Sequence, residues 1–80
     1  MTVKIKYFGL IADITKRNEE LFSLSESVIT TEELISDLYK IYTELKNTSF
    51  VIAVNKSIVT SDLKLNNNDI IALLPPFAGG

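Results

Sequence analysis

The end of the chain carries the residues whose types and order suggest chemistry. The sequence finishes with Gly79 and Gly80, two of only three glycines among its 80 residues. Because glycine has no Cβ atom, such a pair can pass through a narrow channel and let another backbone approach closely. The terminal carboxylate of Gly80, with an ordinary pKa of roughly 3.3–3.7, is ionised at neutral pH and is a poor electrophile. The sequence therefore predicts a terminal acyl group that another protein must activate.

The residues just before the diglycine favour an extended segment. Pro75 and Pro76 have no N–H to donate to a sheet ladder, so a strand that reaches Leu74 must stop there. Their fixed φ favours an extended exit, and six residues span about 20 Å at roughly 3.3–3.6 Å each. A frayed terminus is the ordinary alternative, but this one is apolar. We expect residues 75–80, here called the C-terminal tail, to insert into a partner through Pro75, Pro76, Phe77, Ala78 and Gly79, with Phe77 in an apolar recess.

Composition removes most other kinds of chemistry. The chain has no cysteine and no histidine, so it lacks thiolate nucleophiles, the commonest general base and the commonest metal ligands. We therefore expect no metal site. Acidic residues that are neighbours in sequence show no sign of a pocket and are expected on the solvated surface: Glu19, Glu20, Glu32, Glu33 and Asp37.

Length and charge restrict the number of domains and the kinds of partner that the protein can have. Eighty residues are enough for one domain, 1–80, with a globular part over 1–74. A net charge of −2 with scattered lysines argues against nucleic-acid binding. The first residues alternate rather than run apolar, and no stretch reaches the ~20 apolar residues of a membrane span. We expect a cytoplasmic protein that binds neither nucleic acid nor membrane.

One amphipathic helix is the clearest element. Thr30 and Glu33 form a capping-box pattern, in which the threonine accepts the N3 amide and the glutamate reaches back to the cap. An apolar stripe follows at Leu34, Leu38, Ile41 and Leu45. The pattern predicts a helix of about four turns, ending near residue 47.

Alternation and turn residues predict the strands. Residues 2–8 alternate with period two, and residues 20–24 give a second strand with Phe22 and Leu24 on one side. A short helical turn is expected near residues 10–14. The later part predicts strands at 50–54, 57–59 and 70–74, turns at 55–56 and 66–69, and a loop anchored by Leu63 and Leu65.

These elements predict an α+β roll, a mixed sheet packed on one main helix, with the first and last strands side by side. One helix covers only one face of the sheet. If Val3, Ile5, Ile71 and Leu73 face the helix, then an apolar set faces outward, which indicates a docking surface. The residues expected in it are Phe8, Ala72 and Leu74, joined by Ile58; of these, Phe8, Ile58 and Leu74 are the expected partner-binding residues.

The residues resemble a known family. The segments Val-Lys-Ile-Lys-Tyr-Phe-Gly-Leu (3–10), Ala-Val-Asn (53–55) and Asn-Asp-Ile-Ile-Ala-Leu-Leu-Pro-Pro-Phe-Ala-Gly-Gly (68–80), with the helix from Thr31, resemble the MoaD family of ubiquitin-like sulfur carriers, the small subunits of molybdopterin synthase. The resemblance implies the β-grasp fold. The ending Pro-Pro-x-Ala-Gly-Gly is its most specific part, and the match covers the whole chain.

The resemblance also implies a function. It implies that Gly80 is adenylated by an E1-like adenylyltransferase with ATP and converted to a thiocarboxylate with sulfur from a sulfurtransferase or cysteine desulfurase. The sulfur would then go to cyclic pyranopterin monophosphate in the large subunit, within a heterotetramer of two small and two large subunits. No cofactor is expected on this chain, and the catalytic residues are expected on the large subunit.

Departures from the family pattern and alternatives remain. Asn67-Asn68 stands where the family commonly has Asp-Gly, and Ile70 where it commonly has an acid; asparagine tolerates positive φ, so the fold is still expected. Carriers of thiamine biosynthesis share the diglycine end but are usually shorter and lack the two prolines. A ubiquitin-like modifier would differ only in passing its activated glycine to a lysine. A pure binding module would not need the tail.

Overall fold

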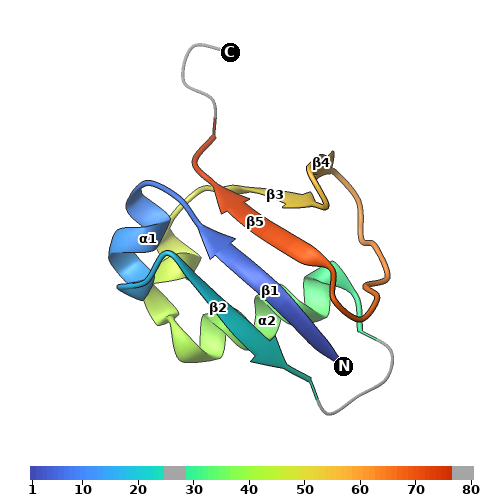
Figure 1. Ribbon diagram of the computed structural model, residues 1–80. Helices are drawn as coiled ribbons and strands as arrows, with labels where there is room; N and C mark the ends of the chain where they lie inside the picture. Colours follow the sequence, from blue (N-terminus) through green and yellow to red (C-terminus); the bar gives the residue numbers. More distant parts are fainter. Residues whose placement is uncertain (25–28, 77–80) are drawn as a thin grey trace.

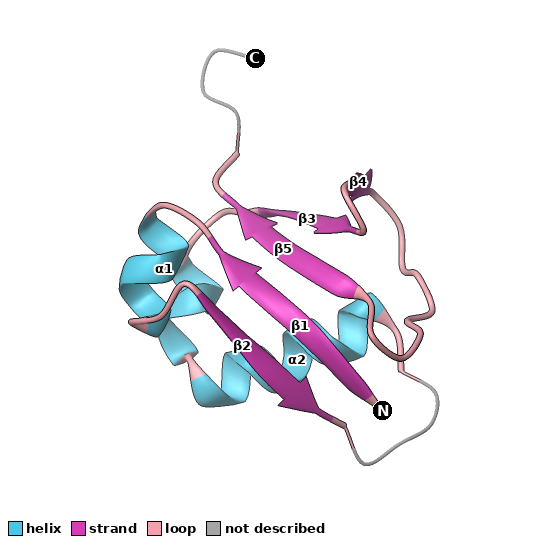
Figure 2. Cartoon of the chain, in the orientation of Figure 1, coloured by secondary structure: helices cyan, strands magenta, loops and turns pink. Residues whose placement is uncertain are grey.

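A five-stranded mixed sheet packs with one face on a helix (Figure 1). The computed structural model describes residues 1–24 and 29–76. The strands lie in the order β2-β1-β5-β3-β4, with β1 and β5 parallel and the other neighbours antiparallel. This is the expected ubiquitin-like β-grasp fold, with these elements (Figure 2): β1 Thr2–Tyr7, α1 Leu10–Thr15, β2 Glu19–Ser23, α2 Thr31–Ile41, the 3₁₀ helix η1 Thr43–Asn47, β3 Val51–Val54, β4 Ser57–Val59 and β5 Ile70–Leu74.

The core lies between the sheet and α2. Alternation along the two central strands places every second side chain on the helix side. Val3, Ile5, Ile71 and Leu73 are fully buried there, as the sequence predicts. The parity of β1 and β5 is therefore confirmed, and their other side chains face away from the helix.

The start of α2 follows the capping-box prediction. The Thr30 hydroxyl accepts a hydrogen bond from the Glu33 amide at 3.4 Å, and the Glu33 carboxylate accepts one from the Thr30 amide at 3.1 Å. Asp62 adds a second cap from a distant loop, accepting from the Thr31 hydroxyl and the Glu32 amide at 3.0 Å each. The hydrogen bond from the Glu32 amide is the main cause that lowers the pKa of Asp62.

The predicted end of the main helix is wrong in part. The α-helix stops at Ile41, and Tyr42 leaves it with φ −118° and ψ 79° before η1 begins. Leu45 is buried as expected, but Ile41 is 56% exposed. Ile41 lies beside Phe22 in a surface groove along β2, which is the edge of the sheet, so no further strand covers it.

The turns have the predicted chemistry. Asn55 and Lys56 have φ of 50° and 76° between β3 and β4, and Asn68 has φ of 71° before β5. Leu65 is buried, but the Leu63 side chain is 43% exposed, so the expected anchoring by that side chain is wrong. The backbone at Leu63 holds the loop instead, since its carbonyl accepts from the Thr31 amide at 2.8 Å. In residues 1–24 and 29–76, no helix is long and apolar enough to cross a membrane.

Candidate functional site

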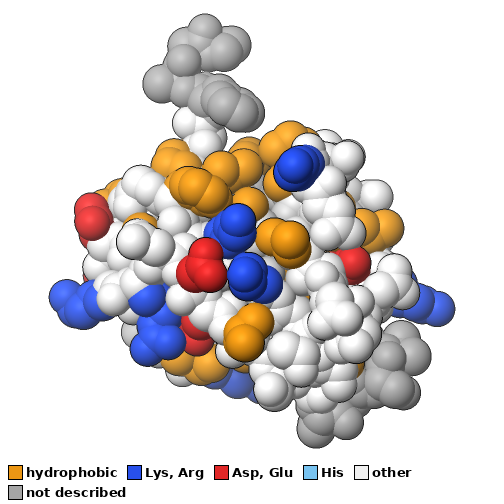
Figure 3. Space-filling model, in the orientation of Figure 1, with side chains coloured by type: hydrophobic (Ala, Val, Ile, Leu, Met, Phe, Trp, Pro, Cys, Tyr) orange, Lys and Arg blue, Asp and Glu red, His pale blue; other side chains and the backbone are white. Residues whose placement is uncertain are grey.

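The sheet face opposite α2 carries an apolar area at the end of β5. Its members come from three neighbouring strands, because Val51 pairs with Leu74 and Ala53 pairs with both Ala72 and Ile58, and from Phe8 just after β1. Figure 3 looks onto this face and shows hydrophobic side chains gathered around the end of β5. We call it the outer patch, and its residues are Phe8, Val51, Ala53, Ile58, Ala72 and Leu74.

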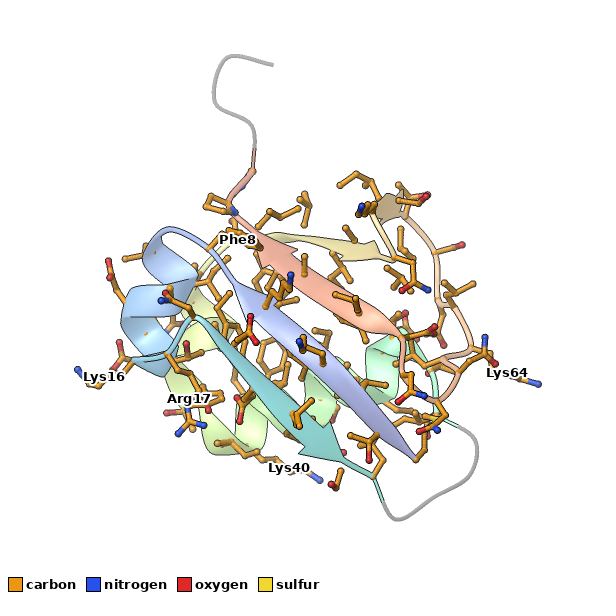
Figure 4. All side chains as sticks on the ribbon, in the orientation of Figure 1. Phe8, Lys16, Arg17, Lys40 and Lys64 are labelled. Atoms are coloured by element: carbon orange, nitrogen blue, oxygen red, sulfur yellow. The ribbon has the colours of Figure 1, made fainter. Side chains whose placement is uncertain are left out.

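The three expected partner-binding residues lie in the outer patch. Phe8 is 44% and Ile58 50% exposed, and Leu74 is half-buried. Phe8 follows β1 and lies at the end of β5 (Figure 4), where its amide donates to the Leu73 carbonyl at 3.2 Å. Their outward orientation is confirmed, and their part in binding stays a prediction. The sequence analysis did not place Val51, whose signal would have been the register of β3 against β5.

The other half of the same face is charged. Lys4 forms an ion pair with Glu19 at 3.5 Å, and Lys6 pairs in register with Glu19 on one side and Ala72 on the other. Both groups of the ion pair are about half exposed, so the pair contributes little to stability. The outer face therefore has an apolar half beside the start of the tail. The half over β1 and β2, here called the charged half, carries Lys4, Lys6 and Glu19 around the exposed Leu21.

The C-terminal tail begins at the edge of the outer patch. β5 ends at Leu74, as the two prolines predict, and Pro75 and Pro76 are exposed. A further bond of the parallel ladder would need a donor at Pro75, which has none. In a continued ladder that donor would bond to the Phe8 carbonyl. This carbonyl instead accepts a hydrogen bond from the Ile11 amide of α1 at 3.1 Å. Phe77, Ala78, Gly79 and Gly80 lie outside the described residues, so their expected roles stay predictions.

A polar cluster on the inner side of the sheet was missed by the sequence analysis. Glu20, expected on the solvated surface, has a side chain only 15% exposed. Its Oε2 accepts from the Tyr7 hydroxyl at 2.5 Å and from the Tyr42 hydroxyl at 2.8 Å, and Arg17 lies 3.3 Å from its Oε1. The sequence contained a signal for this burial. Glu20 has the same parity as Phe22 and Leu24, so the three side chains share the inner side of the sheet.

Burial and these hydrogen bonds explain the titration behaviour of the two phenols. Desolvation, followed by the hydrogen bond to Glu20, raises the pKa of Tyr7 far above its ordinary 10.0. The same two causes raise the pKa of Tyr42. Two neutral phenols share one carboxylate on the inner side of the sheet, away from the outer patch. They join β1 and the break between α2 and η1 to β2, which is a structural role.

A second buried polar group also has a structural role. Asp69 accepts from the Asn55 side chain at 2.9 Å and from the Asn66 amide at 2.8 Å, and Asn55 in turn accepts from the Ile70 amide at 3.0 Å. This network joins the β3–β4 turn to the start of β5. Across the described parts of the chain, no three His, Cys, Asp or Glu residues are grouped to hold a metal ion. The chemical role expected for the terminal carboxylate of Gly80 lies outside these residues and stays a prediction.

Comparison with known proteins agrees with this geometry. A molybdopterin synthase sulfur carrier subunit from Dictyostelium discoideum is 32% identical over 81 residues, with 96% of this chain and 94% of the relative covered. Subunit 1 of a molybdopterin converting factor from Pyrococcus furiosus superposes with a TM-score of 0.85 at 28% identity, covering 96% and 99% of the two chains. This chain also superposes on a chain in the solved complex of subunits 1 and 2 of the molybdopterin-converting factor from Helicobacter pylori. The TM-score is 0.69 at 25% identity, and the match covers 100% of this chain and 100% of that chain. The model of the ThiS family matches residues 5–80, and the chain belongs to the ThiS family.

Proposed function

We propose that this protein is the sulfur carrier subunit of a molybdopterin synthase and that Gly80 carries the sulfur as a thiocarboxylate. The observation that supports this most strongly is the 32% identity to a sulfur carrier subunit over 96% of the chain. The tail that ends in the diglycine starts beside the outer patch, so docking and delivery would use one side of the molecule.

The chemistry needs activation from outside the chain. A carboxylate oxygen of Gly80 attacks the α-phosphorus of ATP on an E1-like adenylyltransferase, and pyrophosphate leaves. A sulfur nucleophile, supplied by a sulfurtransferase or cysteine desulfurase, then attacks the acyl carbon, and AMP leaves. With a persulfide of the donor as the nucleophile, the product is an acyl disulfide. A second thiol then attacks the donor sulfur, which releases the thiocarboxylate and leaves a disulfide on the donor. The thiocarboxylate passes its sulfur to cyclic pyranopterin monophosphate, and water restores the carboxylate of Gly80. This chain provides the acyl group and the docking surface, and it needs no cofactor of its own.

The large subunit of the synthase is the proposed main partner. The solved complex of subunits 1 and 2 of the Helicobacter pylori factor supports such a pairing. The outer patch would bind the large subunit and, in turn, the activating enzyme, and the tail would reach the active site of each. A heterotetramer of two small and two large subunits is the proposed assembly.

Changes at the terminus test the proposal. Deleting Gly80, or adding one residue after it, should abolish sulfur transfer to cyclic pyranopterin monophosphate, because the acyl group would be misplaced or missing. Circular dichroism and the melting temperature should stay unchanged, since the core is built from residues that precede Pro75. Full transfer by the extended protein, without removal of the added residue, would rule the proposal out.

The same assay separates the other uses of an activated glycine. A ubiquitin-like modifier would form an amide with a lysine of a target protein, seen as a product of higher mass on a denaturing gel. A carrier of thiamine biosynthesis would become thiocarboxylated but leave cyclic pyranopterin monophosphate unchanged. Sulfur transfer to the pterin is expected only from the proposed function.

A further inference from the structure

Gly9 has a backbone conformation that side chains rarely allow. Its φ is 57° and its ψ −134°, in the mirror image of the extended region, where only glycine is comfortable. The residue turns the chain out of β1 and into α1. Its carbonyl accepts from the Ala12 amide at 3.0 Å and the Asp13 amide at 3.3 Å, so Gly9 caps the short helix through its backbone.

The missing side chain of Gly9 leaves room for the first residue of the tail. A Cβ atom added at Gly9 would lie 2.8 Å from Cγ of Pro75 and 3.7 Å from its Cδ. The first distance is too short for two carbon atoms. Because the proline ring is closed onto its own backbone nitrogen, much of the displacement must be taken up by the chain at Pro75. Gly9 and Pro75 are therefore in close packing, 66 positions apart along the sequence.

Within the described residues, no hydrogen bond ties Pro75 to β1. The Phe8 amide bonds to Leu73, two residues earlier, and the Phe8 carbonyl bonds to Ile11. Pro75 has no amide hydrogen with which to compete for that carbonyl. On the other side, Leu74 is the last residue of β5 that pairs with β3. On the β1 side, the ring of Pro75 thus packs against Gly9 at the point where the chain leaves the sheet.

We propose that Gly9 is a positioning residue for the C-terminal tail: by accepting the ring of Pro75, it fixes the direction in which the chain leaves the outer patch. The expected consequence, correct placement of Gly80 in the active site of the activating enzyme, rests on the proposed function. A misplacement of about 1 Å in a reacting group can cost roughly 100-fold in rate. A methyl group at position 9 should therefore lower kcat/KM for thiocarboxylation by roughly 10- to 100-fold.

A double-mutant cycle separates this role from simple strain. Gly9→Ala introduces backbone strain whether residue 75 is proline or alanine. The clash of the new methyl group, by contrast, requires the ring of Pro75. We compare wild type, Gly9→Ala, Pro75→Ala and the double variant for thiocarboxylation by the activating enzyme with ATP and a sulfur donor. Pro75→Ala has its own effect, which the cycle cancels. Gly9→Ala should cost about tenfold less in the Pro75→Ala background than in wild type, and equal costs in both would overturn the proposal.

An NMR measurement on the wild-type protein tests the contact without any assay. A nuclear Overhauser effect is expected between the α-protons of Gly9 and the γ-protons of Pro75. Its absence would overturn the proposal even if Gly9→Ala failed to fold. If the wild type were not thiocarboxylated at all, the proposed function would fail. The positioning role would then be decided by this contact and by whether Gly9→Ala shifts the Pro75 signals.

Discussion

Glu20 shows how one residue can organise distant parts of this small protein. It belongs to β2, yet it binds the hydroxyls of Tyr7 from β1 and of Tyr42 from the break between α2 and η1. The rings of the two tyrosines meet edge to face, with centroids 6.1 Å apart. A carboxylate acceptor makes these hydrogen bonds stronger than neutral ones. The cluster therefore holds the chain at Tyr42, the residue at which α2 ends.

Tyr7→Phe should remove one of these bonds and lower the free energy of unfolding by about 1.5–3 kcal/mol at pH 7, the usual range for hydrogen bonds to charged groups. The pKa of Tyr7 is raised above its ordinary 10.0 in the folded state, so the stability linked to its proton is complete below pH 10. It is lost as the pH rises above 10, because the unfolded chain then releases the proton first. Denaturant unfolding at pH 7–11 should show a steeper alkaline loss for wild type than for Tyr7→Phe.

Tyr39→Phe is the matched control for that comparison. Tyr39 packs its ring on Phe50, with centroids 6.4 Å apart, away from the Glu20 cluster. Its variant should keep most of the alkaline slope of wild type. Equal slopes for wild type and Tyr7→Phe would contradict the role given to the Glu20 cluster.

The elements of the outer face show why one side of the sheet is left for a partner. α2, together with Ile11 of α1 and Leu45 of η1, covers the inner face. β5 carries apolar residues on both faces, so Ala72 and Leu74 lie on the face that the described helices leave open. Exposed apolar area marks an interaction surface, and under the proposed function this one would bind the large subunit and the activating enzyme in turn. The charged half over β1 and β2 gives a direct internal comparison.

Phe8→Asp or Leu74→Asp should weaken binding to the large subunit by at least ~2 kcal/mol, the usual threshold for a residue that dominates an interface. The melting temperature should change little, because both side chains face away from the core. Leu21→Asp is the control, since Leu21 is 69% exposed and pairs with Lys4 on the charged half. Isothermal titration calorimetry measures the affinities. A loss with Leu21→Asp as large as with Leu74→Asp would show that the outer patch is not the binding centre.

Much of this element-level account could be predicted from the sequence. Period-two alternation gave the inward faces of β1 and β5, and the Thr30–Glu33 pattern gave the start of α2, because both signals are local. The end of α2 and the burial of Glu20 depend on contacts between β1, β2 and η1, which local periodicity does not contain. The packing of Pro75 on Gly9 joins the two ends of the chain, so only the folded arrangement shows it.

At the scale of the whole molecule, the parallel pairing of β1 and β5 is the central feature. It places the end of β1 beside the end of β5, so that Phe8, Leu74 and the start of the tail meet where these two inner strands end. The buried side chains of both strands pack in the core and hold the strand ends in place. A protein without cysteine or histidine can then take part in acyl chemistry by presenting its terminus to enzymes that supply the catalysis.

Intact mass spectrometry tests the central claim most directly. The protein is incubated with an E1-like adenylyltransferase, ATP and a sulfur donor, and its mass is compared with that of a sample lacking ATP. The account predicts an ATP-dependent gain of about 16 Da, from exchange of the terminal OH for SH, located at Gly80 by fragmentation. An unchanged mass, under conditions in which a known sulfur carrier is converted, would contradict the account.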